Sequence, residues 1–251
     1  MLGALILTFI VSADDGLLGE ALTATEAPKT LRAAFTVELT SESARRVFSF
    51  DPRLPVGDRW SLVSSRGKDE ALDDVARNWS GDAAPDSWLF PDDLRASVSD
   101  TEAAEVLGQA WRIRYAHQLS PNDDDALDEW AAERLAATAW IDPMTERFLR
   151  IDHELTDPVR GPSGGQLTRF QQTYLLDTDP DYGVSYVSAF AVDLSARYGF
   201  RRFDRRYEAR LIEVDLFFSS RAAERDFFHR TLQAPAQVSA AVPAARPGGD
   251  Q

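Results

Sequence analysis

Apolar and polar residues alternate over long stretches of this chain, and this alternation constrains the fold more than any other feature. In residues 31–40 one side of an extended strand would carry Leu31, Ala33, Phe35, Val37 and Leu39. In residues 110–119 the corresponding side would carry Trp111, Ile113, Tyr115, His117 and Leu119. A period of two is typical of half-buried antiparallel strands, because their two faces meet different surroundings. The chain is therefore expected to form an antiparallel sheet with one buried face.

Shorter runs predict the remaining strands. Two follow the first strand, one with Phe48 and Phe50 on one face and one with Trp60 and Leu62 in register. The sequence DPMT, from Asp142 to Thr145, separates two alternating runs and predicts a hairpin with a type I turn. Three long strands are expected in residues 166–176, 183–194 and 207–218, with the Arg-rich residues 197–206 as a connection. Two short strands are expected around the turn at Pro91.

Helical spacing occurs in fewer places. Short helices are predicted in residues 17–27 and 221–232, and a third at 121–135, where proline and acidic residues precede the apolar positions. In residues 68–79 the helical spacing is carried by Leu72, Val75, Ala76 and Trp79. No internal repeat or linker divides the chain. The expected class is α+β, with about ten antiparallel strands and two or three helices inserted between them.

The two ends of the chain differ from the body. Residues 2–11 form an apolar run of signal-peptide length, and small residues at 11–13 precede Asp14 and Asp15. Residues 1–13 are therefore expected to be a signal peptide, although a buried N-terminal strand or helix, or a misassigned start, is the alternative. Residues 14–232 are expected to form a single domain. Residues 233–251 are rich in Pro, Ala and Gly and are expected to be a disordered tail.

Charge and composition exclude several classes of function. The formal net charge is −14, with 41 acidic against 27 basic residues, which disfavours binding to nucleic acids or to anionic membranes. The chain has no cysteine, so disulfides, thiolate metal sites and cysteine nucleophiles are excluded. No later stretch is apolar and long enough to be a transmembrane segment.

The motifs that suggest chemistry have simpler interpretations. Ser163-Gly164-Gly165-Gln166 matches the signature of ABC-type ATPases, but no Walker A loop accompanies it, so a loop between strands is expected. Asp177, Asp179 and Asp181 alternate like calcium ligands, but the glycine and glutamate of an EF-hand are missing, so a solvated turn is expected. No catalytic residues, cofactor or metal ligands are predicted.

Histidine spacing gives no zinc motif. His117, His153 and His229 lie on separate elements, and only His117 and His153, both in predicted strands, could meet across the sheet.

Large side chains on the alternating strands are the candidate functional residues. They form an ordinary core, or they line an apolar cleft that a curved sheet leaves partly unfilled under the inserted helices. The candidate lining residues are Phe35, Val37, Phe48, Phe50, Trp60, Leu62, Trp111, Ile113, Tyr115, Phe148 and Phe190. The candidate lid residues, on the helix at 68–79, are Leu72, Val75 and Trp79.

The order of these elements resembles that of the outer-membrane lipoprotein carrier (LolA-like) superfamily of bacterial periplasmic proteins. A run typical of these carriers is also similar to W-I-D-P-M-T-E-R-F-L-R, from Trp140 to Arg150. This resemblance implies an incomplete barrel, a strongly curved antiparallel sheet whose concave face is covered by helices. It also implies an apolar cavity for acyl chains. The carriers have a functional arginine in their early strands. Arg32, Arg45 and Arg46 are all candidates for it, so the role is assigned to none of them.

The leading hypothesis is an exported, soluble, monomeric carrier, without enzymatic activity, that holds an acyl chain or a lipidated protein in its cleft. An envelope scaffold of the same fold with a filled core is the first alternative. A hydrolase with convergent groups of shifted pKa in a polar cleft is the second.

Overall fold

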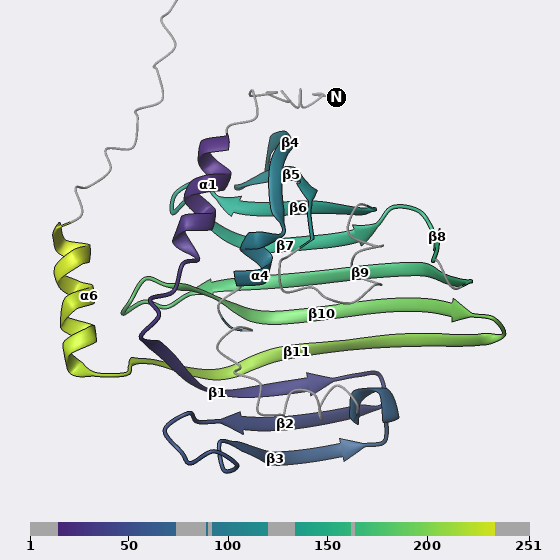
Figure 1. The fold of residues 1–251 in the computed structure, drawn as a ribbon, viewed down its shortest axis with the longest axis horizontal. Coiled ribbons are helices and arrows are strands. Elements are labelled where there is room, and N and C mark those ends of the chain that lie inside the picture. Colours follow the sequence, from purple (N-terminus) through teal and green to yellow (C-terminus); the bar gives the residue numbers. More distant parts are fainter. Residues whose placement is uncertain (1–14, 74–88, 90–91, 120–133, 162–163, 234–251) are drawn as a thin grey trace, which may run out of the picture.

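The computed structural model describes residues 15–73, 89, 92–119, 134–161 and 164–233. Within these ranges the strands form one 11-stranded antiparallel sheet, in the order β3-β2-β1-β11-β10-β9-β7-β6-β5-β4, with β8 paired to β9 (Figure 1). In the described part of the chain β3 and β4 are the two edges and do not pair with each other, so the sheet is not closed into a barrel. The predicted class, a sheet-dominated α+β fold, is confirmed.

Most strands lie close to the predicted positions, but β4 extends through residues for which no strand was predicted, and β8 was not predicted. The first five are β1 (Leu31–Thr40), β2 (Ala44–Phe50), β3 (Trp60–Gly67), β4 (Val98–Leu107) and β5 (Ala110–His117). The next three are β6 (Leu135–Asp142), β7 (Arg147–Leu155) and β8 (Val159–Arg160). The last three are β9 (Gly165–Thr178), β10 (Ser185–Tyr198) and β11 (Arg201–Phe218).

The pairing of β1 with β11 joins the first strand to the last. It runs from Leu31 opposite Phe218 to Thr40 opposite Glu208. On one face of this ladder Ala33, Phe35 and Leu39 are buried, and Thr36 and Glu38 on the other face are only partly covered. The alternating apolar residues therefore lie on the face of the sheet that is in the core, as the sequence predicted.

The predicted hairpin at Asp142 is present between β6 and β7. The Asp142 carboxylate accepts hydrogen bonds from the Met144 amide and the Thr145 hydroxyl, both at 2.9 Å. The backbone closes the turn with a bond from the Glu146 amide to the Asp142 carbonyl, at 2.8 Å. Proline at the second position and aspartate at the first are the residues that such a turn favours.

Three helices are described: α1 (Asp15–Ala24), α4 (Asp92–Ala96) and α6 (Arg221–Gln233). The predicted helices at 17–27 and 221–232 correspond to α1 and α6. Helix α1 buries Leu18 and Ala21 against the sheet. Helix α6 lies beside the end of β11 (Figure 1), where Phe227 contacts Phe218 and Tyr182 donates a hydrogen bond of 2.9 Å to Glu224.

Two predictions about local structure are wrong. Residues 92–96 form a helix where a short strand was expected, because Leu94 is buried in the core and the Ser97 hydroxyl bonds the Leu94 carbonyl at 2.8 Å. Residues 197–206 are not a connection, since β10 and β11 continue through them to a turn at residues 199–200. All ten residues of this stretch are exposed, and five of them are arginine, so its sequence lacks the alternation of a half-buried strand.

The motif loops have the simple structures that were expected. Gly161 and Gly164 lie in the connection between β8 and β9 and share a hydrogen bond of 3.3 Å. The Asp179 carboxylate accepts the Asp181 and Tyr182 amides at 3.0 and 2.8 Å, so it closes the turn. Predictions for residues 1–14, 74–88, 90–91, 120–133, 162–163 and 234–251, among them the turn at Pro91, lie outside the described residues.

Candidate functional site

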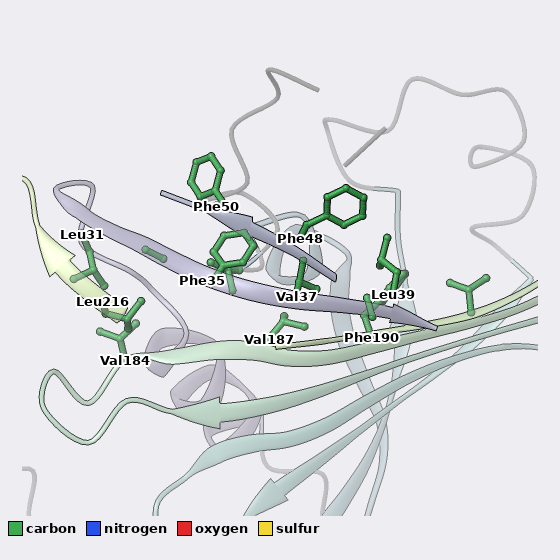
Figure 2. Close-up of a cluster of buried hydrophobic side chains, with 14 of the residues drawn as sticks. Leu31, Phe35, Val37, Leu39, Phe48, Phe50, Val184, Val187, Phe190 and Leu216 are labelled. Atoms are coloured by element: carbon green, nitrogen blue, oxygen red, sulfur yellow. The ribbon is translucent and has the colours of Figure 1, made fainter. Parts of the chain in front are cut away.

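The face of the sheet on which the core side chains lie is called here the inner face. Its first cluster gathers around β1, β2, β10 and β11 (Figure 2). The buried members drawn there include Leu31, Phe35, Val37, Leu39, Phe48, Phe50, Val184, Val187, Phe190 and Leu216. Since these side chains come from both ends of the sequence, this part of the inner face depends on the pairing of β1 with β11.

Trp60 makes this cluster strongly aromatic. Its ring centroid lies 4.9 Å from that of Phe50 and 5.7 Å from that of Phe35, the latter in an edge-to-face arrangement. Phe48 is also in edge-to-face contact, at 6.4 Å. Such ring pairs stabilise a core by about 0.5–1.5 kcal/mol each beyond the area that they bury. Trp60 belongs to the edge strand β3, so it is only partly buried.

A second cluster occupies the inner face at β4 to β7. It includes Ile113 and Tyr115 on β5, Ile141 on β6 and Phe148 on β7, with α1 packed against it. Tyr174 of β9 packs against both clusters. The two clusters are therefore parts of one continuous apolar face.

The predicted lining residues divide between these clusters. The first contains Phe35, Val37, Phe48, Phe50, Phe190 and, partly buried, Trp60. The second contains Ile113, Tyr115, Phe148 and, partly buried, Trp111. Leu62 lies opposite Phe48 in the β2–β3 ladder but is 56% exposed, because β3 is an edge strand.

Two leucines outside the sheet cover the first cluster. Leu72 and Leu89 are 1% and 0% exposed and belong to the cluster itself. Leu72 lies in a helical turn at residues 70–73, where the predicted lid helix begins. The other predicted lid residues, Val75 and Trp79, lie outside the described residues. The segment of residues 69–73 is called here the cover anchor.

Polar contacts hold the cover anchor to the end of β1 and the start of β2. Asp69 caps the helical turn by accepting the Leu72 amide at 3.1 Å. The same carboxylate accepts the Ser41 hydroxyl at 2.6 Å and the Ser43 hydroxyl at 3.4 Å. The bond from Ser41 is the main reason that the pKa of Asp69 is lowered. These bonds favour the ionised carboxylate, so the anchor is strongest with Asp69 charged.

Arg46 makes the second tie to the cover anchor. Its position on β2 has the same parity as Phe48 and Phe50, and it is 6% exposed. The guanidinium pairs with Asp73 at 2.8 Å and donates to the Arg66 carbonyl at 2.6 Å. A buried cation requires such partners, since an uncompensated one is costly. Among the three early arginines, Arg46 is the one buried at the edge of the inner face.

A polar group lies within the second cluster. The Tyr115 hydroxyl and His153 Nε2 are 3.2 Å apart, and the ring of His117 meets that of His153 edge to face at 4.7 Å. The sequence-based expectation that these two histidines could meet is thus met. Burial, followed by the charge of His117, lowers the pKa of His153 to about 4. Burial also raises the pKa of Tyr115 well above its usual value. Both groups are therefore neutral at pH 7.

This polar group is not arranged as a metal site. Among the described residues no group of three or more His, Cys, Asp or Glu side chains is placed to hold a metal ion. His229, on α6, is exposed and belongs to another part of the molecule.

The important polar contacts were missed by reading the sequence alone. Nothing in the neighbouring sequence marks Asp69 or Asp73 as part of a contact. The same is true of the pairing of Tyr115 with His153. Arg46 does have one, because an arginine at an inward position between Ala44 and Phe48 departs from an otherwise apolar pattern. Such a residue indicates a buried partner of opposite charge.

Surface clefts occur among the described residues, and the following pair contains no predicted lining residue. One, of about 470 Å³, includes Glu42, Asp193 and Arg206. The other, of about 600 Å³, includes Arg169, Arg197 and Phe200. Both are open and partly charged.

In the described part of the chain no helix is long and apolar enough to cross a membrane.

Comparison with known proteins gives only distant similarity. No protein-family model matches the chain, and no curated protein matches it. Among solved structures, an outer membrane lipoprotein-sorting protein domain from Vibrio parahaemolyticus is similar, with a TM-score of 0.36 and 14% identity over 87% of this chain and 98% of that one. GphF Dehydratase 1 gives a TM-score of 0.15 and 12% identity, over 84% of this chain and 86% of that one. At these scores neither likeness assigns an activity, so any function must be argued from the chain's own geometry.

Proposed function

We propose that the chain is a carrier that binds an acyl chain, free or attached to a protein, on the inner face of its sheet. The observation that supports this most directly is the construction of the cover. Leu72 and Leu89 bury apolar side chains against the aromatic cluster, while the described ties of the anchor to the strands are polar and lie at the rim. A cover held in this way can leave the sheet without disrupting the strand ladders.

The energy of exchange also supports binding. Withdrawal of Leu72 and Leu89 would expose their own side chains and the part of the first cluster that they pack against. An acyl chain that took their place would gain about 0.8 kcal/mol per buried methylene group. A chain of ordinary length can therefore offset the cost of breaking the polar ties, which is typically about 1 kcal/mol each.

The proposed role is binding and delivery, with no catalytic step. Tyr115 and His153 point into the second cluster as neutral, hydrogen-bonded partners, and burial favours that state for both. Export to a periplasm is proposed with this role, from the apolar residues 2–11 and the small residues that follow them.

The test is a titration of the full chain with cis-parinaric acid, whose fluorescence rises in apolar surroundings. We expect saturable binding to the wild type. Asp73→Asn should raise the affinity about fivefold, because a tie on the order of 1 kcal/mol no longer holds the cover closed. The matched control is Glu105→Gln, since Glu105 is as exposed as Asp73 and pairs with Arg112 at 2.8 Å on β4 and β5. Its affinity should equal that of the wild type.

Two results would contradict the carrier proposal. One is the absence of saturable binding to both the wild type and Asp73→Asn, which would favour a scaffold with a permanently filled core. The other is an equal rise in affinity for Asp73→Asn and Glu105→Gln, because the cover would then have no specific part in access.

A further inference from the structure

The joined ends of β10 and β11 form a basic tip on an acidic protein. Their ladder continues to Tyr198 opposite Arg201, whereas the ladder of β11 with β1 ends at Glu208. Residues 197–206, called here the basic tip, contain five arginines and one aspartate in a chain of net charge −14. Figure 1 shows the tip at the opposite end of the strands from α6.

One face of the basic tip has its charges paired. Arg202 pairs with Asp204 at 2.6 Å. Arg206 lies 3.6 Å from Glu42 and 4.0 Å from Asp193. Arg202 and Arg206 therefore have carboxylate partners within the protein, and Arg197 on the same face donates to the Gly199 carbonyl at 3.1 Å.

The opposite face of the tip has cations and exposed rings. The ladder places Tyr198 opposite Arg201 there, and the alternation of β11 adds Phe203 and Arg205. No ion pair joins Arg201 or Arg205 to a carboxylate in the part of the chain that the structure describes. Tyr198 is 57% exposed and Phe203 52%, and Phe200 in the turn is fully exposed. This face thus combines two arginines lacking such partners with two solvated aromatic rings, and the ring of Phe200 lies in the adjoining turn.

We propose that the basic tip docks the protein on the surface of a bilayer that contains anionic lipids. Aromatic side chains and arginine are the residues that favour the headgroup region, where rings are buried and guanidinium groups meet phosphates. Each arginine at such a surface contributes about 1 kcal/mol. Charges that lie farther from the bilayer than the screening length of about 8 Å at physiological salt contribute little to the repulsion. Local charge can therefore overcome the repulsion expected from the net charge.

The shape of the tip favours a bilayer over a folded protein as the occupant. Phe200 lies in the two-residue turn between the strands and is fully exposed, so a protein partner would need a matching pocket for it. A fluid headgroup layer needs none. Arginines alone are explained by protection of a sheet edge against pairing, but that role does not require three exposed rings beside them.

Vesicle cosedimentation of the full chain tests the proposal. We expect the wild type to sediment with vesicles of phosphatidylcholine and phosphatidylglycerol in equal parts, more at low than at high salt, and much less with phosphatidylcholine alone. Arg201→Gln/Arg205→Gln should weaken binding about thirtyfold, or fivefold for each arginine. Phe200→Ser should also weaken it, without changing its salt dependence. Arg202→Gln, on the paired face, is the matched control and should bind like the wild type.

A spin label tests the orientation independently. Because the chain has no cysteine, Phe200→Cys provides a unique attachment site for a nitroxide. On anionic vesicles this label should become protected from a water-soluble relaxation agent, while a label at Ala222→Cys on α6 should stay accessible.

Several outcomes would overturn the proposal. In the first, the wild type stays in solution with anionic vesicles at low salt. In the second, Arg201→Gln/Arg205→Gln binds like the wild type. In the third, the two spin labels are equally accessible to the relaxation agent. Binding of the wild type to soluble polyglutamate as tight as to vesicles, with no effect of Phe200→Ser, would instead identify an acidic protein as the partner. Thermal unfolding of each variant would show that the exposed substitutions leave the fold intact. None of these outcomes depends on binding of acyl chains to the inner face.

Discussion

Substitution of Gly67 by alanine is expected to destabilise the protein by about 3–5 kcal/mol, with a fall in melting temperature of roughly 10 °C. Gly67 ends β3 with a φ of +72°, a conformation that costs an alanine about 1–2 kcal/mol. The added Cβ would also lie 2.0 Å from the carbonyl oxygen of Ser43. That oxygen belongs to the backbone of the β1–β2 turn, so the turn itself must move.

The displaced turn carries both hydroxyls that hold the cover anchor. Ser41 and Ser43 donate to Asp69, and Ser43 also lies 3.2 Å from the Lys68 carbonyl. Gly67→Ala should therefore raise the affinity for cis-parinaric acid as well as lower stability, if the carrier proposal holds. The loss of stability does not depend on that proposal.

Gly108→Ala is the control for the backbone conformation alone. Gly108 has a φ of +66°, but nothing lies within 4 Å of the position of its added Cβ. This variant should lose only about 1 kcal/mol in urea unfolding. Equal losses in the two variants would mean that the contact with Ser43 contributes nothing, and that the turn moves at no cost.

The strands were predictable because their signals are local. The alternation in residues 31–40 corresponds to β1, and that in residues 110–119 corresponds to β5. The turn residues from Asp142 to Thr145 join β6 to β7 in the predicted hairpin. Each of these needs only its own side chains to decide which face is buried. The identity of the inward residues, such as Phe35 and Ile113, follows from the same alternation.

What the sequence could not predict depends on contacts between distant segments. Pairing of β1 with β11 has no local signature, yet it decides that Phe35 and Leu216 share a cluster. Residues 92–96 are helical because Leu94 is buried against the sheet, which overrides their weak strand pattern. Continuation of β10 and β11 through the arginines was missed for a different reason. Clustered charge normally indicates a loop, but a solvated strand end accepts charge on both faces.

The polar contacts show the same limit. Ser41 and Asp69 are 28 residues apart, and Tyr115 and His153 are 38 residues apart. Neither pair can be recognised before the strand order is known. Arg46 is the exception, since its inward position is evident from the alternation of β2 alone.

Stability is expected to fall as the pH is lowered from about 6.5 to 4, because His153 must take up a proton in the unfolded chain but not in the native one. The pKa of its folded state is about 4, below the ordinary value of 6.5. The unfolded state therefore binds more protons in this window, so the contribution is complete above pH 6.5 and is lost as the pH falls towards 4. At the full difference it amounts to roughly 3 kcal/mol, with a slope of about 1.4 kcal/mol per pH unit.

The surroundings of His153 explain the sign. It is 4% exposed, and it contacts Tyr115 and His117 of β5 and Tyr174 of β9. Burial and the charge of His117 disfavour the imidazolium, while the hydrogen bond with Gln172 and the charge of Asp152 favour it less strongly. A proton on His153 would place a cation in the second cluster, next to the ring of Tyr174 that joins the two clusters.

Urea unfolding of the wild type and His153→Gln at several pH values measures this contribution, because acidic side chains titrate in both proteins and cancel in the difference. Between pH 6.5 and 4.5, the free energy of unfolding of the wild type should fall by about 1.4 kcal/mol per pH unit more than that of His153→Gln. Glutamine can still bond the Tyr115 hydroxyl, so the variant should fold. His229→Gln, in which an exposed histidine on α6 is replaced, should follow the wild type. If His153→Gln and the wild type lose stability in parallel, then the pKa of His153 is the same in the native and the unfolded protein, near its ordinary value of 6.5. In that case the inner face accepts a cation between pH 6.5 and 4.5, and its second cluster is less suited to an acyl chain than the first.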